Sequence, residues 1–392
     1  MDFALTSEQQ TLVQTVRKFV YRELVPLEDE IERTGQLAPE LARSVFEKST
    51  RLGFYATNVP EEYGGGGLSA LETMLLEEQF GHTKDILIRR AFGNVYEVLF
   101  VGTDEQKQRW LLPCVQGERT CSIAITEPGA GSDAAGISTR ATPTGQRWTL
   151  NGHKHFVSDG MFSDFFIVSA VTDPAARPRH ISLFLVDKNT PGVTIGKDQK
   201  MMGLTGTSHV EIFFDDVALG PENLLGGEGN GLRLVLTTLG RVRLGQVGAR
   251  ALGKACRLLT LAVEYSAQRE QFGRPIGDFQ MIQAMLADSA IEIQRSRLLL
   301  WRAAWALDVG DDKAARTLIS MVKVDAAETL GRVADRTVQI FGGSGYAKES
   351  VVERLYRDAR IFRIFDGTSE IHRTVVAGGL RRVGPQVYDV GA

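Results

Sequence analysis

One carboxylate near the C-terminus stands between an apolar segment and a turn of small hydroxylated residues. The segment reads Ile364-Phe-Asp-Gly-Thr-Ser-Glu-Ile-His-Arg373, so Asp366 directly precedes glycine, threonine and serine. A carboxylate held at such a turn could remove a proton as a general base. It could also cap the helix that the next residues begin, because aspartate is a preferred N-cap residue. The two roles can coexist, and the residues alone leave both open.

A second segment that could bind a ligand is Thr126-Glu-Pro-Gly-Ala-Gly-Ser-Asp133, which follows a predicted strand. Small residues flanked by hydroxyls let backbone amides approach a flat polar ligand closely. A surface turn is the alternative. Two other glycine-rich segments, 64–67 and 227–231, lack the strand–turn–helix context of a dinucleotide fingerprint, and we expect them to be turns.

The residue types that usually hold metals do not gather in the sequence. His153 and His155 share one face of a predicted strand, but no third ligand lies nearby in sequence. Cys114, Cys121 and Cys256 follow no metal-binding or disulfide spacing. We therefore expect no metal site and reduced thiols.

The elements that position these residues fall into three stretches, and the pattern of apolar residues differs between them. Residues 1–120 and 231–392 show apolar residues at helical spacing, whereas residues 121–230 contain short β-branched and aromatic runs. This order predicts a helical domain, a β-sandwich or barrel, and a second helical domain, giving a mainly α protein with a central β-domain. Ser7 and Gln10 predict a capping box, and Asn151-Gly152 predicts the turn of a hairpin.

Composition excludes several classes of function. The 392 residues are 43% hydrophobic and 24% charged, with a formal net charge of −3. A nucleic-acid-binding protein usually has a basic face, so we expect no nucleic-acid partner. The N-terminal residues lack the pattern of a signal peptide, and no apolar run is long enough to span a bilayer. The expected location is the cytoplasm, with no membrane partner.

The motifs, taken in order, resemble the flavin-dependent acyl-CoA dehydrogenase family. The similar segments are 126–133, 151–160, 203–208, 216–226, 269–280, 339–346 and 364–373. The resemblance implies an N-terminal helical domain, a central β-domain and a C-terminal four-helix bundle. It also implies bound FAD and usually a homotetramer.

The same resemblance implies roles for individual residues. Those implied to line the flavin ring are Ile125, Thr126, Ser132, Phe156 and Ser158, with Thr368 nearby. Those implied to contact the phosphate or adenosine of FAD are Arg269, Gln271 and Phe272, while Gln339 and Gly343 reach the FAD of a neighbouring subunit. Those implied to contact substrate are Ser132, Gly367 and Arg243, although a one-residue length difference lies near Arg243.

In this family a carboxylate removes the α-proton of an acyl thioester while a β-hydride passes to the flavin. Electron-transfer flavoprotein then reoxidises the flavin. The base that precedes Gly-Thr is usually glutamate, so Asp366 is one methylene shorter, and misplacement by about an ångström can cost ~10²-fold in rate. Some members carry the base on an earlier helix, but no acid lies between Glu228 and Glu264. Asp366 is therefore the expected base.

The expected substrate is an acyl group on coenzyme A or on a carrier protein. Arg89 and Arg90 could meet an anionic substrate tail or the nucleotide of coenzyme A, or form a solvated helix end. Two other functions stay open. One is a flavin oxidase of the nitroalkane-oxidase type, which also uses an aspartate base, and the other is a flavin-binding protein without catalytic activity.

Overall fold

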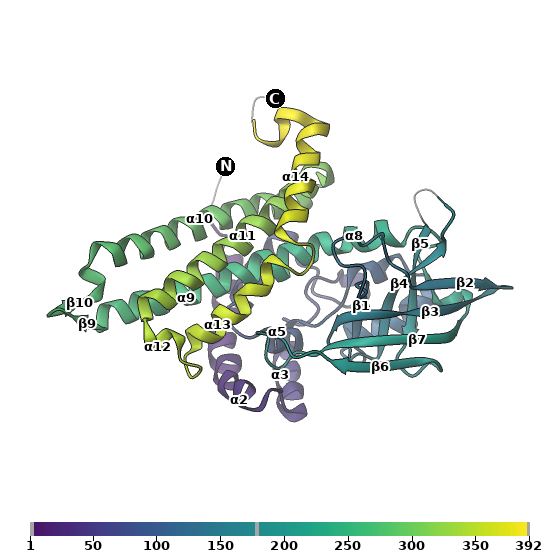
Figure 1. The fold of residues 1–392 in the computed structure, drawn as a ribbon, viewed down its shortest axis with the longest axis horizontal. Coiled ribbons are helices and arrows are strands. Elements are labelled where there is room, and N and C mark those ends of the chain that lie inside the picture. Colours follow the sequence, from purple (N-terminus) through teal and green to yellow (C-terminus); the bar gives the residue numbers. More distant parts are fainter. Residues whose placement is uncertain (1–3, 177–179, 390–392) are drawn as a thin grey trace.

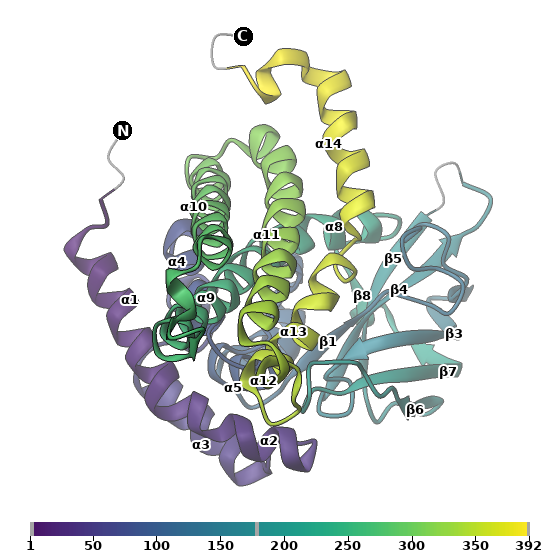
Figure 2. The ribbon, with the colours of Figure 1, turned by 60° about the vertical axis from the view of Figure 1, so that its left-hand side comes forward.

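The computed structural model describes residues 4–176 and 180–389 (Figures 1 and 2). Helices come first, strands occupy the middle of the chain, and long helices follow. The first helices are α1 (Ser7–Phe19), α2 (Glu28–Thr34), α3 (Pro39–Arg51), α4 (Ala70–Phe80), α5 (Asp85–Phe92), α6 (Asp104–Gln106) and α7 (Leu112–Val115). Within the described ranges, no helix combines the length and apolar composition that a membrane span requires.

The first helix begins one residue earlier than the sequence predicted. Thr6, not Ser7, is the N-cap of α1: its hydroxyl accepts the backbone N–H of Gln9 at 3.2 Å, and the Gln9 side chain accepts the N–H of Thr6 at 3.1 Å. Both spacings fit a capping box, and the sequence could not separate them. Thr103 caps α6 in the same way.

The middle part is one eight-stranded sheet. Its strands are β1 (Cys121–Ala124), β2 (Arg140–Thr144), β3 (Arg147–Ser158), β4 (Phe165–Asp173), β5 (His180–Asp187), β6 (Val193–Asp198), β7 (His209–Leu219) and β8 (Leu224–Leu225). The order is β6-β7-β3-β2-β4-β5-β8, and β1 pairs in parallel with β4. Both faces of β4 are buried, since Phe165 and Phe166 enter different apolar clusters. The expected sandwich or barrel therefore takes the form of a single sheet.

The predicted hairpin turn at Asn151-Gly152 is wrong. Strand β3 runs through both residues, and the actual hairpin joins β2 to β3 around Gly145, which has a φ of +64°. At Gly152 a Cβ would lie 2.4 Å from the hydroxyl oxygen of Thr139, so glycine serves a close approach. Asn151 and Asp216 exchange two hydrogen bonds where the register with β7 shifts.

The last part is built from long helices. They are α8 (Gly231–Val242), α9 (Arg250–Gln268), α10 (Gln280–Asp308), α11 (Asp312–Phe341), α12 (Gly343–Tyr346), α13 (Val351–Arg360) and α14 (Ser369–Val383). A π-helical turn, Arg243–Ala249, joins α8 to α9, and a small hairpin of β9 (Glu270–Gln271) and β10 (Arg274–Pro275) joins α9 to α10. Figure 1 shows this hairpin at the end of the bundle opposite the sheet.

Buried ion pairs fix the N-terminal helices to the bundle. Arg250 on α9 bonds Glu77 on α4 at 2.6 Å and Asp85 on α5 at 3.1 Å. Asp308 at the end of α10 accepts the N–H groups of Ala70 and Leu71, where an acid complements the start of α4. These contacts fix α4 and α5 beside the π-helical turn, where the candidate site lies.

Candidate active site

Asp366 occupies a strained turn between α13 and α14. Its φ is +54°, a left-handed conformation that costs a non-glycine residue free energy, and Gly367 follows with a φ of +90°. The helix α14 is capped by Thr368, whose hydroxyl accepts the N–H of Ile371 at 3.2 Å. The alternative role of Asp366 as the cap of this helix is therefore wrong.

Two side chains hold the main chain of Asp366. Arg243 donates from Nε to the Asp366 carbonyl oxygen at 2.8 Å, and His372 approaches the same oxygen at 3.1 Å. Burial lowers the pKa of His372 to about 4, so the ring is neutral. A carbonyl oxygen only accepts, so Nε2 of His372 carries the proton and Nδ1 accepts from the hydroxyl of Ser320 at 3.1 Å.

The carboxylate of Asp366 takes no part in holding the turn. Among the residues that the structure describes, neither of its oxygens has a hydrogen-bond partner. Burial raises its pKa, while the charges of Arg243, Lys323 and Arg89 oppose that rise. Lys323 on α11 is fully buried, and its Nζ has no hydrogen-bond partner among residues 4–176 and 180–389. Burial lowers its pKa to about 8 against the attraction of Asp366.

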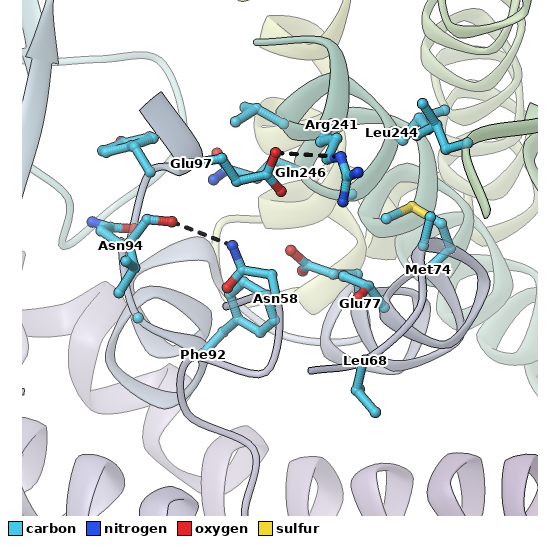
Figure 3. A pocket seen from close by; sticks show the side chains of 18 residues that line it. Asn58, Leu68, Met74, Glu77, Phe92, Asn94, Glu97, Arg241, Leu244 and Gln246 are labelled. Carbon is cyan, nitrogen blue, oxygen red and sulfur yellow. Dashed lines mark hydrogen bonds and ion pairs between the residues drawn. The ribbon is translucent and has the colours of Figure 1, made fainter. Parts of the chain in front are cut away.

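A cavity of about 50 Å³ lies between the N-terminal helical part and the segment around Arg241–Gln246 (Figure 3). Its wall includes Val242 and Leu244, which flank Arg243, and Tyr96, whose hydroxyl is close enough for the charge of Asp366 to help raise its pKa. Glu97 and Arg241 form an ion pair at 3.3 Å in the same wall. Burial raises the pKa of Glu97 to about 7, and Arg241 only partly offsets it.

The predicted flavin loop lies directly against β3. His155 donates its backbone N–H to the Thr126 carbonyl at 2.8 Å, and Nζ of Lys154 donates to the Ile125 carbonyl at 3.0 Å. Buried Lys154 also pairs with Glu127 at 2.8 Å. Folding thus brings the residues predicted to line the flavin ring onto two adjacent segments: they are Ile125, Thr126, Ser132, Phe156 and Ser158.

The end of β3 and the Asp366 turn approach the same guanidinium. Arg89 lies 3.8 Å from Asp159, which follows Ser158, and its charge also opposes the rise that burial causes in the pKa of Asp366. Arg89 is buried and bonds Asp85 at 2.6 Å, whereas Arg90 pairs with Asp159 at 3.4 Å. Neither arginine is a solvated helix end, and both make internal ion pairs.

The other predicted FAD contacts lie elsewhere in the chain. Arg269, Gln271 and Phe272 belong to the exposed hairpin at the far end of the bundle (Figure 1), where 95% of Phe272 is exposed. Gln339 and Gly343 lie near them, because Tyr265 stacks on Phe341 at 4.1 Å. One chain therefore does not bring these residues together with the flavin loop.

Sequence reasoning singled out the two strand histidines but missed their neighbour. Nε2 of His153 and Nε2 of His155 both lie 3.8 Å from the same oxygen of Glu211 on β7. In the described part of the chain no group of three such side chains has the arrangement of a metal site. Glu211 lies 56 positions or more away in sequence, so only the strand pairing could reveal it.

Three family models match this chain in succession. They are "Acyl-CoA dehydrogenase, N-terminal domain" at residues 6–118, "middle domain" at 122–217 and "C-terminal domain" at 229–380. The protein belongs to the acyl-CoA dehydrogenase family. It is therefore an oxidoreductase of the class that acts on CH–CH groups.

Individual acyl-CoA dehydrogenase relatives match over nearly the whole chain. The caffeyl-CoA reductase-Etf complex subunit CarC of Acetobacterium woodii is 36% identical over 386 residues, covering 95% of this chain and 98% of the relative. The structure of butyryl-CoA dehydrogenase from Megasphaera elsdenii has a TM-score of 0.89 and 36% identity, covering 97% and 100%. The FAD complex of PigA has a TM-score of 0.88 and 29% identity, covering 97% and 99%.

FAD is the cofactor of this acyl-CoA dehydrogenase, and the residues present fit it. A Cβ at Gly129 or Gly131 would meet nothing within 4 Å, so the loop presents open backbone to a ligand. Beside the loop, Phe156 leaves 47% of its surface exposed at a φ of +55°. An exposed aromatic ring next to open amides suits a planar, polar ring system.

Several residues around Asp366 were not singled out from the sequence. Glu97 and Lys323 are each the single charged residue of a mostly apolar run, Val95–Val101 and Leu318–Val324, and that isolation is the signal that could have found them. His372, six residues after Asp366, lies inside the recognised motif and could have been found from it. The π-helical turn at Arg243–Ala249 accommodates one additional residue, which suits the length difference expected near Arg243.

Proposed function

We propose that this protein dehydrogenates acyl thioesters between Cα and Cβ to give 2-enoyl thioesters, with Asp366 as the base. The supporting observation is the state of Asp366 itself. Its carbonyl is held by Arg243 and His372, its carboxylate makes no hydrogen bond within the described residues, and Thr368 takes over the capping of α14. A residue held by its main chain, with an uncommitted acid group, is suited to general-base catalysis.

The proposed reaction needs Asp366 to be ionised before it meets the α-proton. Burial favours the neutral acid, which strengthens the carboxylate as a base, while Arg243 and Lys323 favour the ionised form. When bound, FAD supplies the acceptor for the hydride that leaves Cβ. Arg243, Gly367 and Ser132 are the proposed contacts for the thioester and its carrier.

Two partners belong to this proposal. Electron-transfer flavoprotein is the proposed electron acceptor, and the name of the Acetobacterium woodii relative supports it. The second proposed partner is another copy of the same chain. The distance between the flavin loop and the hairpin that carries Arg269, Gln271 and Phe272 supports contacts to the FAD of a neighbouring copy. The homotetramer remains a prediction from the family.

The test is the variant Asp366→Asn, mixed without air with a panel of acyl-CoA thioesters and nitroalkanes. We expect normal FAD content and complete loss of flavin bleaching by thioesters. The exposed Asp29→Asn, 87% exposed at its side chain, serves as the matched control and should bleach at the wild-type rate. Bleaching of Asp366→Asn at the wild-type rate would overturn the assignment. Bleaching by nitroalkanes alone, with rapid reoxidation by air, would indicate the oxidase instead.

A further inference from the structure

A buried ion pair lies behind the predicted flavin loop. Lys154 on β3 is 0% exposed, Glu127 at the start of the loop is 4% exposed, and their charged atoms lie 2.8 Å apart. Taking two charges out of water is costly, and a well-packed apolar pair is often as stable or more stable. Stability alone therefore does not account for the pair, and its contacts with the loop do.

The ammonium of Lys154 holds the start of the loop. Its Nζ donates to the Ile125 carbonyl at 3.0 Å, to Glu127 at 2.8 Å and to the hydroxyl of Ser169 on β4 at 3.2 Å. An ammonium has three donors, and all three are used. Two of the bonds reach the loop and one reaches the sheet. Lys154 thus ties Ile125, which is predicted to line the flavin ring, to β3.

The carboxylate of Glu127 ties the end of the loop to its start. Its Oε2 accepts the backbone N–H and the hydroxyl of Ser138, both at 2.6 Å, and its Oε1 accepts the N–H of Thr139 at 3.0 Å. One side chain therefore joins two points of the chain that lie 11 positions apart. A loop that is ordered before its ligand arrives costs the ligand less binding free energy.

The segment between these points, 128–137, has an open side that the pair must hold in place. Ala130 and Ile137 are buried, but Gly129, Gly131 and Ser132 are exposed. A Cβ at either of these glycines would meet nothing within 4 Å. Ser132 is predicted to line the flavin ring, so its position depends on how the two ends of the segment are fixed.

We propose that Lys154 and Glu127 are positioning residues for FAD, which hold the loop in the shape that receives the flavin ring. Both side chains are buried behind the loop, so they act through the backbone of Ile125 and Ser138 rather than through contacts of their own with the cofactor. The proposal concerns the binding of FAD and does not depend on the role proposed for Asp366.

The test is the affinity for FAD, measured from the flavin fluorescence that appears when the holoenzyme is diluted. The variant is Lys154→Met with Glu127→Gln, which removes both charges and leaves no lone buried ion. We expect the dissociation constant for FAD to rise by about 10- to 100-fold, the equivalent of roughly one or two hydrogen bonds. With FAD in excess, the visible circular dichroism of the bound flavin should also change. A dissociation constant within about twofold of the wild-type value overturns the proposal.

Ser169→Ala is the matched control on the same lysine. It removes the bond from Lys154 to β4 and leaves both bonds to the loop. We expect it to lower the urea midpoint and to leave the FAD affinity and the circular dichroism unchanged. If Ser169→Ala weakens FAD binding as much as the paired variant does, the effect comes from the stability of the sheet and the proposal is overturned.

A second control removes a largely buried ion pair elsewhere. Arg297→Met with Glu78→Gln takes away a contact of 2.7 Å between α10 and α4 and should keep the FAD affinity. A loss of affinity equal to that of the first paired variant would mean that any buried pair has this effect, which overturns the proposal.

Glu127→Gln alone serves if the paired variant fails to fold. An amide offers one acceptor oxygen in place of two, so it cannot serve both Lys154 and Ser138. We expect about tenfold weaker FAD binding, and an unchanged dissociation constant overturns the proposal. None of these measurements depends on turnover. Failure of every thioester to bleach the wild-type flavin would therefore overturn the proposed dehydrogenation alone.

Discussion

Arg243 holds Asp366 by its main chain: Nε of the arginine donates to the aspartate carbonyl oxygen at 2.8 Å. His372 adds a second donor at 3.1 Å. The two bonds fix a turn that the positive φ of Asp366 would otherwise make unfavourable. Both bonds engage the backbone of Asp366, so its carboxylate stays available. The shorter side chain, one methylene less than glutamate, therefore extends from a backbone whose position is fixed.

Replacing Arg243 should therefore damage catalysis more than folding. We expect Arg243→Met to lower kcat by about 10- to 100-fold, since misplacement by an ångström has that order of effect. It should also move the acid limb of the pH profile upward, because Arg243 opposes the raised pKa of Asp366. Stopped-flow bleaching across pH measures both. Arg233→Met, at an exposed site on α8 just before the π-helical turn, is the control, and an unchanged kcat in Arg243→Met would contradict the expectation.

Lys323 is predicted to lower stability while it favours the ionised form of Asp366, the proposed base. Its pKa is lowered to about 8, against about 10.4 in an unfolded chain, so its charge destabilises the fold below pH 8 and the penalty fades between pH 8 and 10.4. Lys323→Met should raise the free energy of unfolding at pH 7 by on the order of 2–3 kcal/mol, measured by urea titration.

The same substitution should shift the pH dependence of kcat/KM. Without the charge of Lys323, the pKa of Asp366 rises further, so its base form appears at higher pH and the acid limb moves to higher pH. Lys323→Arg keeps a cation and should keep the limb near its wild-type position. If Lys323→Met raises the stability but leaves the acid limb of the pH profile in place, the lysine destabilises the fold without affecting the ionisation of Asp366.

Local signals in the sequence were enough for most elements and for the family motif around Asp366, whose role as base stays a prediction. The β-branched and aromatic runs of residues 121–230, one of which forms β4, and the motif around Asp366 each depend on a few neighbouring residues. The prediction of a turn at Asn151-Gly152 is wrong because the glycine is needed for the close approach of Thr139. That contact forms only on folding. Glu97 and Arg241 lie 144 positions apart, so their pairing could not be predicted. The domain boundaries and the FAD contacts remain predictions.

Gly152 should not tolerate a side chain. A Cβ there would lie 2.4 Å from Thr139, which is fully buried, so Gly152→Ala forces β3 and the segment before β2 apart. We expect a loss of about 1–3 kcal/mol in unfolding free energy. The matched control is Gly378→Ala on α14, where a Cβ meets nothing within 4 Å, and it should be neutral or stabilising by up to about 1 kcal/mol. Equal effects of the two substitutions would contradict the close approach.

The buried pair beneath the flavin loop should control acid stability. Burial would raise the pKa of Glu127, but the bond from Lys154 outweighs it and brings the value to about 2. The stabilisation is therefore complete above pH 4.5, the value of a free glutamate, and is lost as pH falls towards 2. Lys154→Met leaves Glu127 buried without its cation and should cost about 3–5 kcal/mol at pH 7. Urea titrations at pH 7, 4 and 3 should show this difference shrinking, because protonation removes the lone charge. Adding Glu127→Gln should recover most of the loss at pH 7, and failure to recover it would mean that Lys154 acts through packing instead.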